Sequence, residues 1–162
     1  MIDLLTLYKK QKELDEEICL KHNVNYANTS TSRLIALLVE IGEFANETRA
    51  FKYWSLKGPS AKEVVLEEYV DALHFYLSVG IGDGNYLKEI KELQIDKPLN
   101  EKILDVYTSI IEYSKDRTLQ NYTNSFNLFF DLGKTFGFTL DEIEDAYYLK
   151  LKENHSRQKN NY

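Results

Sequence analysis

The sequence predicts an all-α fold, a bundle of about six helices. Apolar residues recur at helical spacing along most of the 162-residue chain, and no run alternates in the way typical of a strand. With only 2 Pro and 7 Gly, long helices can continue without interruption. The length suits a single domain, residues 1–162, that can bury a core.

The first half of the chain divides into three predicted helices. The first spans about residues 2–21, and a polar loop at 22–31 separates it from the second, at about 31–49. Ser60 and Glu63 have the spacing of a capping box, which would open the third helix. We expect that helix to run to about residue 79, with the stretch Gly80-Ile-Gly-Asp-Gly84 forming the helix stop and a turn.

The second half begins with a polar segment, residues 88–98, where at most one short helix is expected. A fourth helix is predicted over 99–113 and a fifth over 119–136, which Gly137 ends. Thr139 and Glu142 form another capping box, so a last helix runs to about residue 156. The polar tail, 158–162, is expected to be loose.

The composition excludes several classes of protein. A net charge of −6 argues against a general affinity for nucleic acid. The single cysteine, Cys19, rules out an internal disulfide and suits a reducing compartment. No targeting signal and no membrane span is recognisable, so a cytoplasmic protein without membrane partners is expected.

Two acidic motifs form the main candidate site. Glu40-Ile-Gly-Glu43 and Glu68-Tyr-Val-Asp71 each place two carboxylates three residues apart, so each pair shares a helix face. Apolar residues lie among or beside both pairs, and carboxylates in such surroundings need partners. Mg²⁺ prefers oxygen ligands of this kind and usually handles phosphate. The alternative for each motif alone is a solvated helix face.

Three further residues near these motifs are ambiguous. Glu47 and Glu67 are either ligands or surface residues, because each lies at the edge of its acidic strip. His74 follows Asp71 by three residues, as in di-iron bundles, but those need two Glu-x-x-His motifs. A histidine in the core or behind the ligands is the favoured interpretation.

Two other groups are candidates for contact with a ligand. Trp54 either anchors a helix end in the core or forms a wall against a flat ligand, with Lys52 reaching phosphate. Lys150, Asn154 and Arg157 share one face of the last helix. They either complement the helix dipole or bind phosphate oxygens.

These motifs together resemble the all-α nucleoside triphosphate pyrophosphohydrolases, which include the MazG-like proteins and the dimeric dUTPases. Residues 38–55 and 67–78 are similar to the dimeric dUTPase type. Residues 11–15 resemble that family's opening motif, Gln-x-x-Leu-(Asn/Asp), and 148–158 its closing motif, Lys-x-x-x-Asn-x-x-Arg-Gln. Residues 83–115 match no motif of the family.

The resemblance implies a homodimer that hydrolyses dUTP, and also dUDP, to dUMP with two or more Mg²⁺ ions, for which Mn²⁺ can substitute. The implied metal ligands are Glu40, Glu43, Glu68 and Asp71, of which Glu43 and Glu40 also serve catalysis. The implied substrate-binding residues are Gln11 and Asp15 near the base, Trp54 and His74 at the nucleoside, and Lys52, Lys150, Asn154 and Arg157 at the phosphates. Asp15 is an anionic acceptor where the motif also takes Asn, which would change the hydrogen-bond pattern.

Three alternatives remain open from the residues alone. The first is a pyrophosphohydrolase for dCTP or a modified nucleotide, with the same metal site and a different pocket. The second is a non-catalytic helical interaction module whose acidic residues are surface charge. The third is a di-iron carboxylate protein.

Overall fold

The computed structural model describes residues 1–161, and these contain six α-helices and no strand. The helices are α1 (Leu4–His22), α2 (Ser30–Thr48), α3 (Lys62–Asp83), α4 (Leu99–Lys115), α5 (Leu119–Phe136) and α6 (Leu140–Lys159). The predicted all-α bundle is therefore confirmed. Residues 1–161 contain no helix with the length and apolar character that crossing a bilayer requires.

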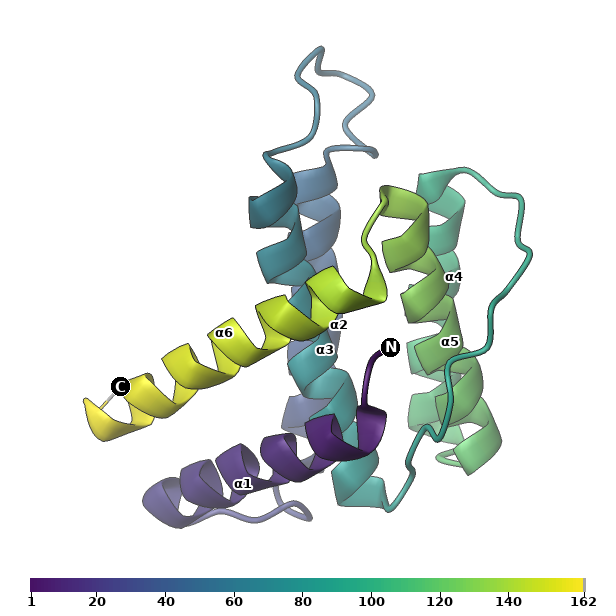
Figure 1. Cartoon of the computed structure of the whole chain (residues 1–162). Coiled ribbons are helices and arrows are strands. Elements are labelled where there is room, and N and C mark those ends of the chain that lie inside the picture. Colours follow the sequence, from purple (N-terminus) through teal and green to yellow (C-terminus); the bar gives the residue numbers. More distant parts are fainter. Residues whose placement is uncertain (162) are drawn as a thin grey trace.

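The helices form three pairs, and the pair α2–α3 lies between the other two (Figure 1). α2 and α3 run side by side through the centre, and α4 and α5 form a hairpin on one side of them. α1 and α6 extend together on the other side, and both pack against α3. Because α3 contacts α1, α2, α5 and α6, it is the helix on which a shared site is built.

Two of the predicted helix boundaries are confirmed with their caps. The Thr139 side chain accepts from the Glu142 backbone, and the Glu142 carboxylate accepts in return from the Thr139 N–H. This reciprocal pair satisfies two backbone donors that a helix start leaves open. Gly137 ends α5 in the left-handed region, at φ 106°, where glycine has no steric penalty.

The predicted boundaries of α3 were wrong at both ends. Ser60 is not an N-cap, because its hydroxyl donates to the Glu47 carboxylate and α3 begins two residues later. The predicted stop at residues 80–84 does end the helix, but only at Gly84, which caps it at φ 71°, so the helix continues past residue 79 to Asp83. Gly80 is needed for packing instead, since a Cβ there would lie 2.3 Å from the Tyr122 hydroxyl oxygen.

Two other segments were expected to have little regular structure, and the fold agrees for the first of them. Residues 85–98 form no helix and cross from the end of α3 to the start of α4 in an irregular conformation. The last helix is longer than expected and includes Gln158 and Lys159 of the predicted tail. Tyr162, the final residue of that tail, lies outside the described residues.

Aromatic side chains fix α5 against α3. The rings of Tyr69 and Phe129 stack with centroids 4.1 Å apart, and the Tyr69 hydroxyl donates to the Phe129 carbonyl at 2.8 Å. About two turns further along α3, Tyr76 stacks on Phe126 at 4.7 Å. All four rings are almost fully buried, so this interface holds α3 rigidly from the side opposite to α1 and α6.

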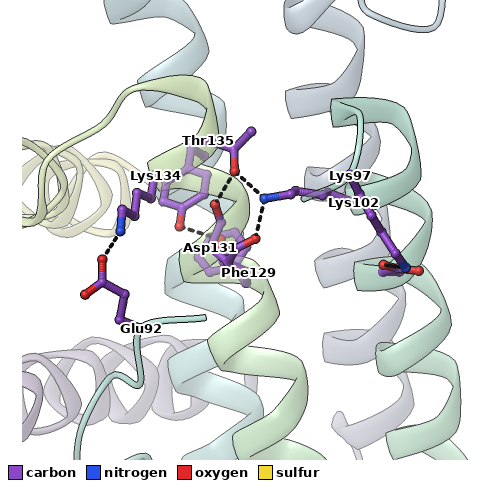
Figure 2. Close-up of polar contacts among 9 residues, drawn as sticks. Glu92, Lys97, Lys102, Phe129, Asp131, Lys134 and Thr135 are labelled. Atoms are coloured by element: carbon purple, nitrogen blue, oxygen red, sulfur yellow. Dashed lines mark hydrogen bonds and ion pairs between the residues drawn. The ribbon is translucent and has the colours of Figure 1, made fainter. Parts of the chain in front are cut away.

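A buried ion pair joins α4 to α5 (Figure 2). The Lys102 ammonium lies 2.8 Å from the Asp131 carboxylate and donates to the Thr135 hydroxyl, also at 2.8 Å. Both charged side chains are only 8% exposed. Such a pair is costly to desolvate, and it is held only while both partners are present.

Candidate active site

Carboxylates of α2 and α3 converge at the centre of the bundle. Within the described part of the chain, Glu40, Glu68 and Asp71 each offer an oxygen atom, and these atoms all lie within 4.8 Å of one another. All three side chains are half-buried. The three-residue step from Glu68 to Asp71 puts both on the face of α3 that meets α2. We call these three residues the carboxylate cluster.

The other acidic residues of the two motifs lie beside the cluster. Glu43 is exposed one turn along α2, and its charge contributes to the environment of Glu40. Glu47 accepts a hydrogen bond from Ser60 at the end of α2. Glu67 is exposed and pairs with Lys150 of α6 at 3.0 Å. Glu47 thus has a structural partner, whereas Glu67 borders the site.

The pKa values of all three carboxyl groups in the cluster are raised. Burial raises the pKa of Glu40 to about 8, and the neighbouring carboxylates of Glu43 and Asp71 add to the shift. Burial likewise raises the pKa of Glu68 to about 7, with Asp71 as the next cause. The pKa of Asp71 is also raised, first by burial, although Lys150 opposes the shift. Three acids that resist ionisation together need positive charge nearby.

These residues fit a hard divalent cation. Carboxylate oxygens are the ligands that Mg²⁺ takes in proteins. The Oε2 atom of Glu40 is buried and has no hydrogen-bond partner among residues 1–161. A buried carboxylate oxygen without a donor is costly, and a bound cation would satisfy it. Both the donor set and this unpartnered atom therefore suit a metal ion.

A buried polar network lies next to the cluster, between α1 and α3. Asp15 accepts from the Gln11 amide at 2.9 Å, the Ser78 hydroxyl at 2.7 Å and the Tyr26 hydroxyl at 3.0 Å. Burial raises the pKa of Asp15 even though these three donors oppose the shift. Asp15 is thus an acceptor for three donors, from α1, α3 and the loop after α1.

His74 completes this network from the face of α3 one turn beyond Asp71. Its Nδ1 lies 2.6 Å from Gln11 Oε1, an acceptor, so Nδ1 carries the proton and donates. Tyr147 of α6 donates to the same Gln11 oxygen at 3.2 Å and stacks on the imidazole ring. Burial lowers the pKa of His74 to about 3, so the ring is neutral and its Nε2 is a bare acceptor. That Nε2 is buried with no partner among the residues described.

Of the three residues predicted on one face of α6, Lys150 joins the cluster directly. Its ammonium lies 3.0 Å from the Asp71 carboxylate and its side chain is 8% exposed. Arg157 forms an ion pair with Glu153, one turn back on the same helix, at 2.5 Å. Asn154 lies between them on α6 and is half-buried. The three side chains share one face of α6, and Lys150 is the one that contacts the carboxylate cluster.

The structure places Trp54 and Lys52 on the long loop that joins α2 to α3 (Figure 1). Trp54 is 65% exposed and packs edge-to-face on Phe51 and Tyr53. The interpretation of Trp54 as a core anchor was therefore wrong, since the loop carries it out of the bundle. Lys52 lies over the ring of Phe51, at 5.8 Å.

Sequence reasoning missed three residues of the polar network: Tyr26, Ser78 and Tyr147. Ser78 follows His74 by four residues, so helical spacing alone indicated that the two share a face. Tyr26 and Tyr147 come from a loop and from α6, and no local pattern relates either residue to Gln11. Only the packing of α1 against α3 and α6 brings them together.

Comparison with known protein families identifies the chain. A family model described as dUTPase matches residues 3–162. The chain belongs to the dUTPase family. The predicted resemblance is confirmed, and dUTP diphosphatase activity follows for this chain at the level of the family. A search of curated proteins found no match.

The raised pKa values predict how the stability of this dUTPase-family chain depends on pH. A carboxyl whose pKa is higher in the folded state stabilises the fold fully below its unfolded value and loses that effect as pH rises through its folded pKa. For Glu68 and Glu40 the loss extends through about pH 7 and about pH 8. The pKa of His74 is lowered from its ordinary value of 6.5, so this residue changes the pH dependence of stability only below about pH 6.5. In EDTA, the melting temperature should therefore fall between pH 6.5 and pH 9.

Glu40→Gln is the variant that checks this assignment, because it removes the largest of these shifts. Differential scanning calorimetry in EDTA should give a flatter dependence of melting temperature on pH for the variant than for the wild type. Glu63→Gln, on the exposed first turn of α3, serves as the control and should keep the wild-type slope. Identical slopes for wild type and Glu40→Gln would contradict the assignment.

Proposed function

We propose that residues 1–162 form one catalytic domain that hydrolyses dUTP, and also dUDP, to dUMP at the carboxylate cluster. The observation that carries this proposal is the convergence of Glu40, Glu68 and Asp71 next to a buried polar network. In a chain of the dUTPase family, this arrangement puts a metal-binding group beside a group suited to reading a base. The cluster supports the phosphate end of the reaction, and the network supports the nucleoside end.

We propose Glu40, Glu43, Glu68 and Asp71 as ligands for two or more Mg²⁺ ions, with Mn²⁺ able to substitute. Divalent cations bound there would neutralise phosphate charge and lower the pKa of a bound water. Glu43, the most exposed of the four, is the group we assign to orient the attacking water or accept its proton. Lys150, Asn154 and Arg157 are proposed to bind phosphate oxygens along α6.

The polar network is proposed to recognise the base. Gln11 is held by Asp15 through its amide nitrogen and by His74 and Tyr147 through its oxygen. Both lone pairs of the amide oxygen are thus engaged, so we propose that the second hydrogen of the amide nitrogen reads the base, because a fixed donor discriminates between bases that differ in their hydrogen-bond pattern. The unpartnered Nε2 of His74 is proposed to accept a hydrogen bond from an N–H or O–H group of the nucleoside. Trp54 is proposed to cover the sugar or base from the loop.

A comparison of nucleotides tests this proposal. Pyrophosphate release from dUTP, dTTP, dCTP and UTP in Mg²⁺ should give a kcat/KM for dUTP at least about tenfold above the others, which is the scale of discrimination that one small group provides. A preference for dCTP would assign the same metal site to a pyrophosphohydrolase of different base specificity. Colourless, iron-free protein should accompany activity, since a coloured iron protein would favour the di-iron alternative.

We also propose that the chain assembles as a homodimer through α2 and α4. These helices are neighbours, joined by a hydrogen bond from the Tyr107 hydroxyl to the Leu38 carbonyl at 3.2 Å. Their outer faces carry four exposed aliphatic side chains, Ile35, Val39, Leu104 and Ile111. Clustered apolar groups of this kind mark protein interfaces more often than free surface.

Sedimentation velocity tests the proposed dimer. The wild type should sediment as a species of twice the 19.0 kDa chain mass, and Val39→Asp or Leu104→Asp should shift it towards the monomer. A charge buried at an interface without a partner is strongly unfavourable. Leu20→Asp, at an exposed leucine of α1, is the matched control. A monomeric wild type would contradict the proposal.

A further inference from the structure

Lys150 is a buried lysine in contact with a proposed metal ligand. Its side chain is 8% exposed, and its ammonium lies 3.0 Å from Asp71 Oδ2 and 3.0 Å from Glu67 Oε1. Glu153, one turn further along α6, is 3.7 Å away. Lysine is seldom buried this far unless it is paired, and here three carboxylates surround it. The ammonium is thus a positive charge already present at the carboxylate cluster.

This contact conflicts with the role proposed for Lys150 in binding phosphate. The ammonium already forms ion pairs with Asp71 and Glu67, so it is not free to bind a phosphate oxygen while these pairs persist. A divalent cation bound to Asp71 would lie close to the Lys150 ammonium on the same carboxylate. The two positively charged groups would repel each other strongly in a partly buried site. The lysine and the cation are therefore expected to bind Asp71 at each other's expense.

We propose that Lys150 is the resident counter-ion of the carboxylate cluster, and that its ion pair with Asp71 competes with divalent cations for that cluster. In the metal-free protein, Lys150 neutralises Asp71 and holds α6 against α3. When the cluster is occupied, Lys150 gives up Asp71 and becomes available to a phosphate oxygen. This inference rests on the proposed metal-dependent function. It adds an order of binding, in which the cation binds before Lys150 contacts the nucleotide.

The surroundings of Lys150 make this exchange specific to one lysine. Tyr147, one turn earlier on α6, is fully buried and fixed to Gln11 and the carbonyl of Leu7, so the helix backbone is held in place. We therefore assign the exchange to the side chain of Lys150 and not to a shift of α6. Lys152, two residues later, is exposed on the same helix and has the same charge. It provides a matched control for the loss of one positive charge.

Titration of the protein with Mn²⁺ alone, without nucleotide, by isothermal calorimetry tests the competition. Lys150→Gln should bind Mn²⁺ at least about tenfold more tightly than the wild type, because a nearby unit charge in a partly buried site is removed. Lys152→Gln should stay within about threefold of the wild type, as expected for an exposed charge. Unchanged or weaker Mn²⁺ binding by Lys150→Gln overturns the inference and leaves the metal site intact. Failure of all three proteins to bind Mn²⁺ overturns the proposed metal site as well.

A measurement on the wild type avoids any doubt about the folding of the variant. Trace acetylation by acetic anhydride, quantified for each lysine by mass spectrometry, reports how accessible each ammonium group is. Acetylation of Lys150 should be slow in EDTA and several-fold faster in Mn²⁺, whereas acetylation of Lys152 should be the same in both. Equal acetylation of Lys150 in the two conditions overturns the inference.

Discussion

Replacing Asp71 by Asn should lower the kcat of dUTP hydrolysis at least about 100-fold, because the variant loses a proposed ligand of the cation that would activate the attacking water. Asp71 is the residue at which the carboxylate cluster and Lys150 meet. Asn keeps the shape of the side chain and removes its charge. The variant thus loses a cation ligand and the partner of a buried ammonium together.

Glu43→Gln should lower kcat to a similar extent, at least about 100-fold, because Glu43 is the group assigned to the attacking water. Initial rates of pyrophosphate release at saturating dUTP and Mg²⁺ measure both variants. Glu63→Gln makes the same charge change on an exposed turn of α3 and should keep the wild-type rate. Full activity in both Glu43→Gln and Asp71→Asn would remove the site assigned here.

Asp131→Ala should lower the free energy of unfolding by about 3–5 kcal/mol, the usual cost of breaking a buried ion pair by removing one partner. Lys102 would stay 8% exposed with only the Thr135 hydroxyl as acceptor (Figure 2). A buried ammonium without a counter-charge is the main penalty. Urea unfolding followed by circular dichroism measures the change.

Two controls separate this effect from the loss of any acidic residue on the surface. Lys97 and Asp105 form an exposed pair at 2.6 Å near the start of α4, and Asp105→Ala should cost no more than about 1 kcal/mol. Lys102→Met combined with Asp131→Leu removes both buried charges and should recover most of the lost stability. A cost below about 1 kcal/mol for Asp131→Ala would show that the pair is not buried in solution.

Local sequence patterns predicted most helices because each helix carries its own signals. The capping box of Thr139 and Glu142 and the stop at Gly137 lie within a few residues and need no tertiary contact. The helix stop was placed too early because Gly80 serves packing against Tyr122, a residue far along the chain, while Gly84 is the cap. Ser60 misled the prediction for the same reason, since Glu47 from the end of α2 takes its hydroxyl.

The candidate site was predictable to the extent that helical spacing determines it. Glu68 and Asp71 share a face of α3 by their separation alone, and Glu40 joins them because α2 packs alongside. The pairing of Lys150 with Asp71 depends on where α6 crosses α3, which no local pattern encodes. The contacts of Asp15 with Tyr26 and Ser78 were hidden for the same reason, whereas its contact with Gln11 lies within α1.

Pyrophosphate release from dUTP, first in Mg²⁺ and then after addition of excess EDTA, tests the carboxylate cluster as a metal-dependent active site most directly. We predict fast hydrolysis in Mg²⁺, its loss in EDTA to the background rate, and its recovery when Mg²⁺ is restored above the chelator. Hydrolysis that continues unchanged in EDTA would contradict the central claim that Glu40, Glu68 and Asp71 act through a bound divalent cation.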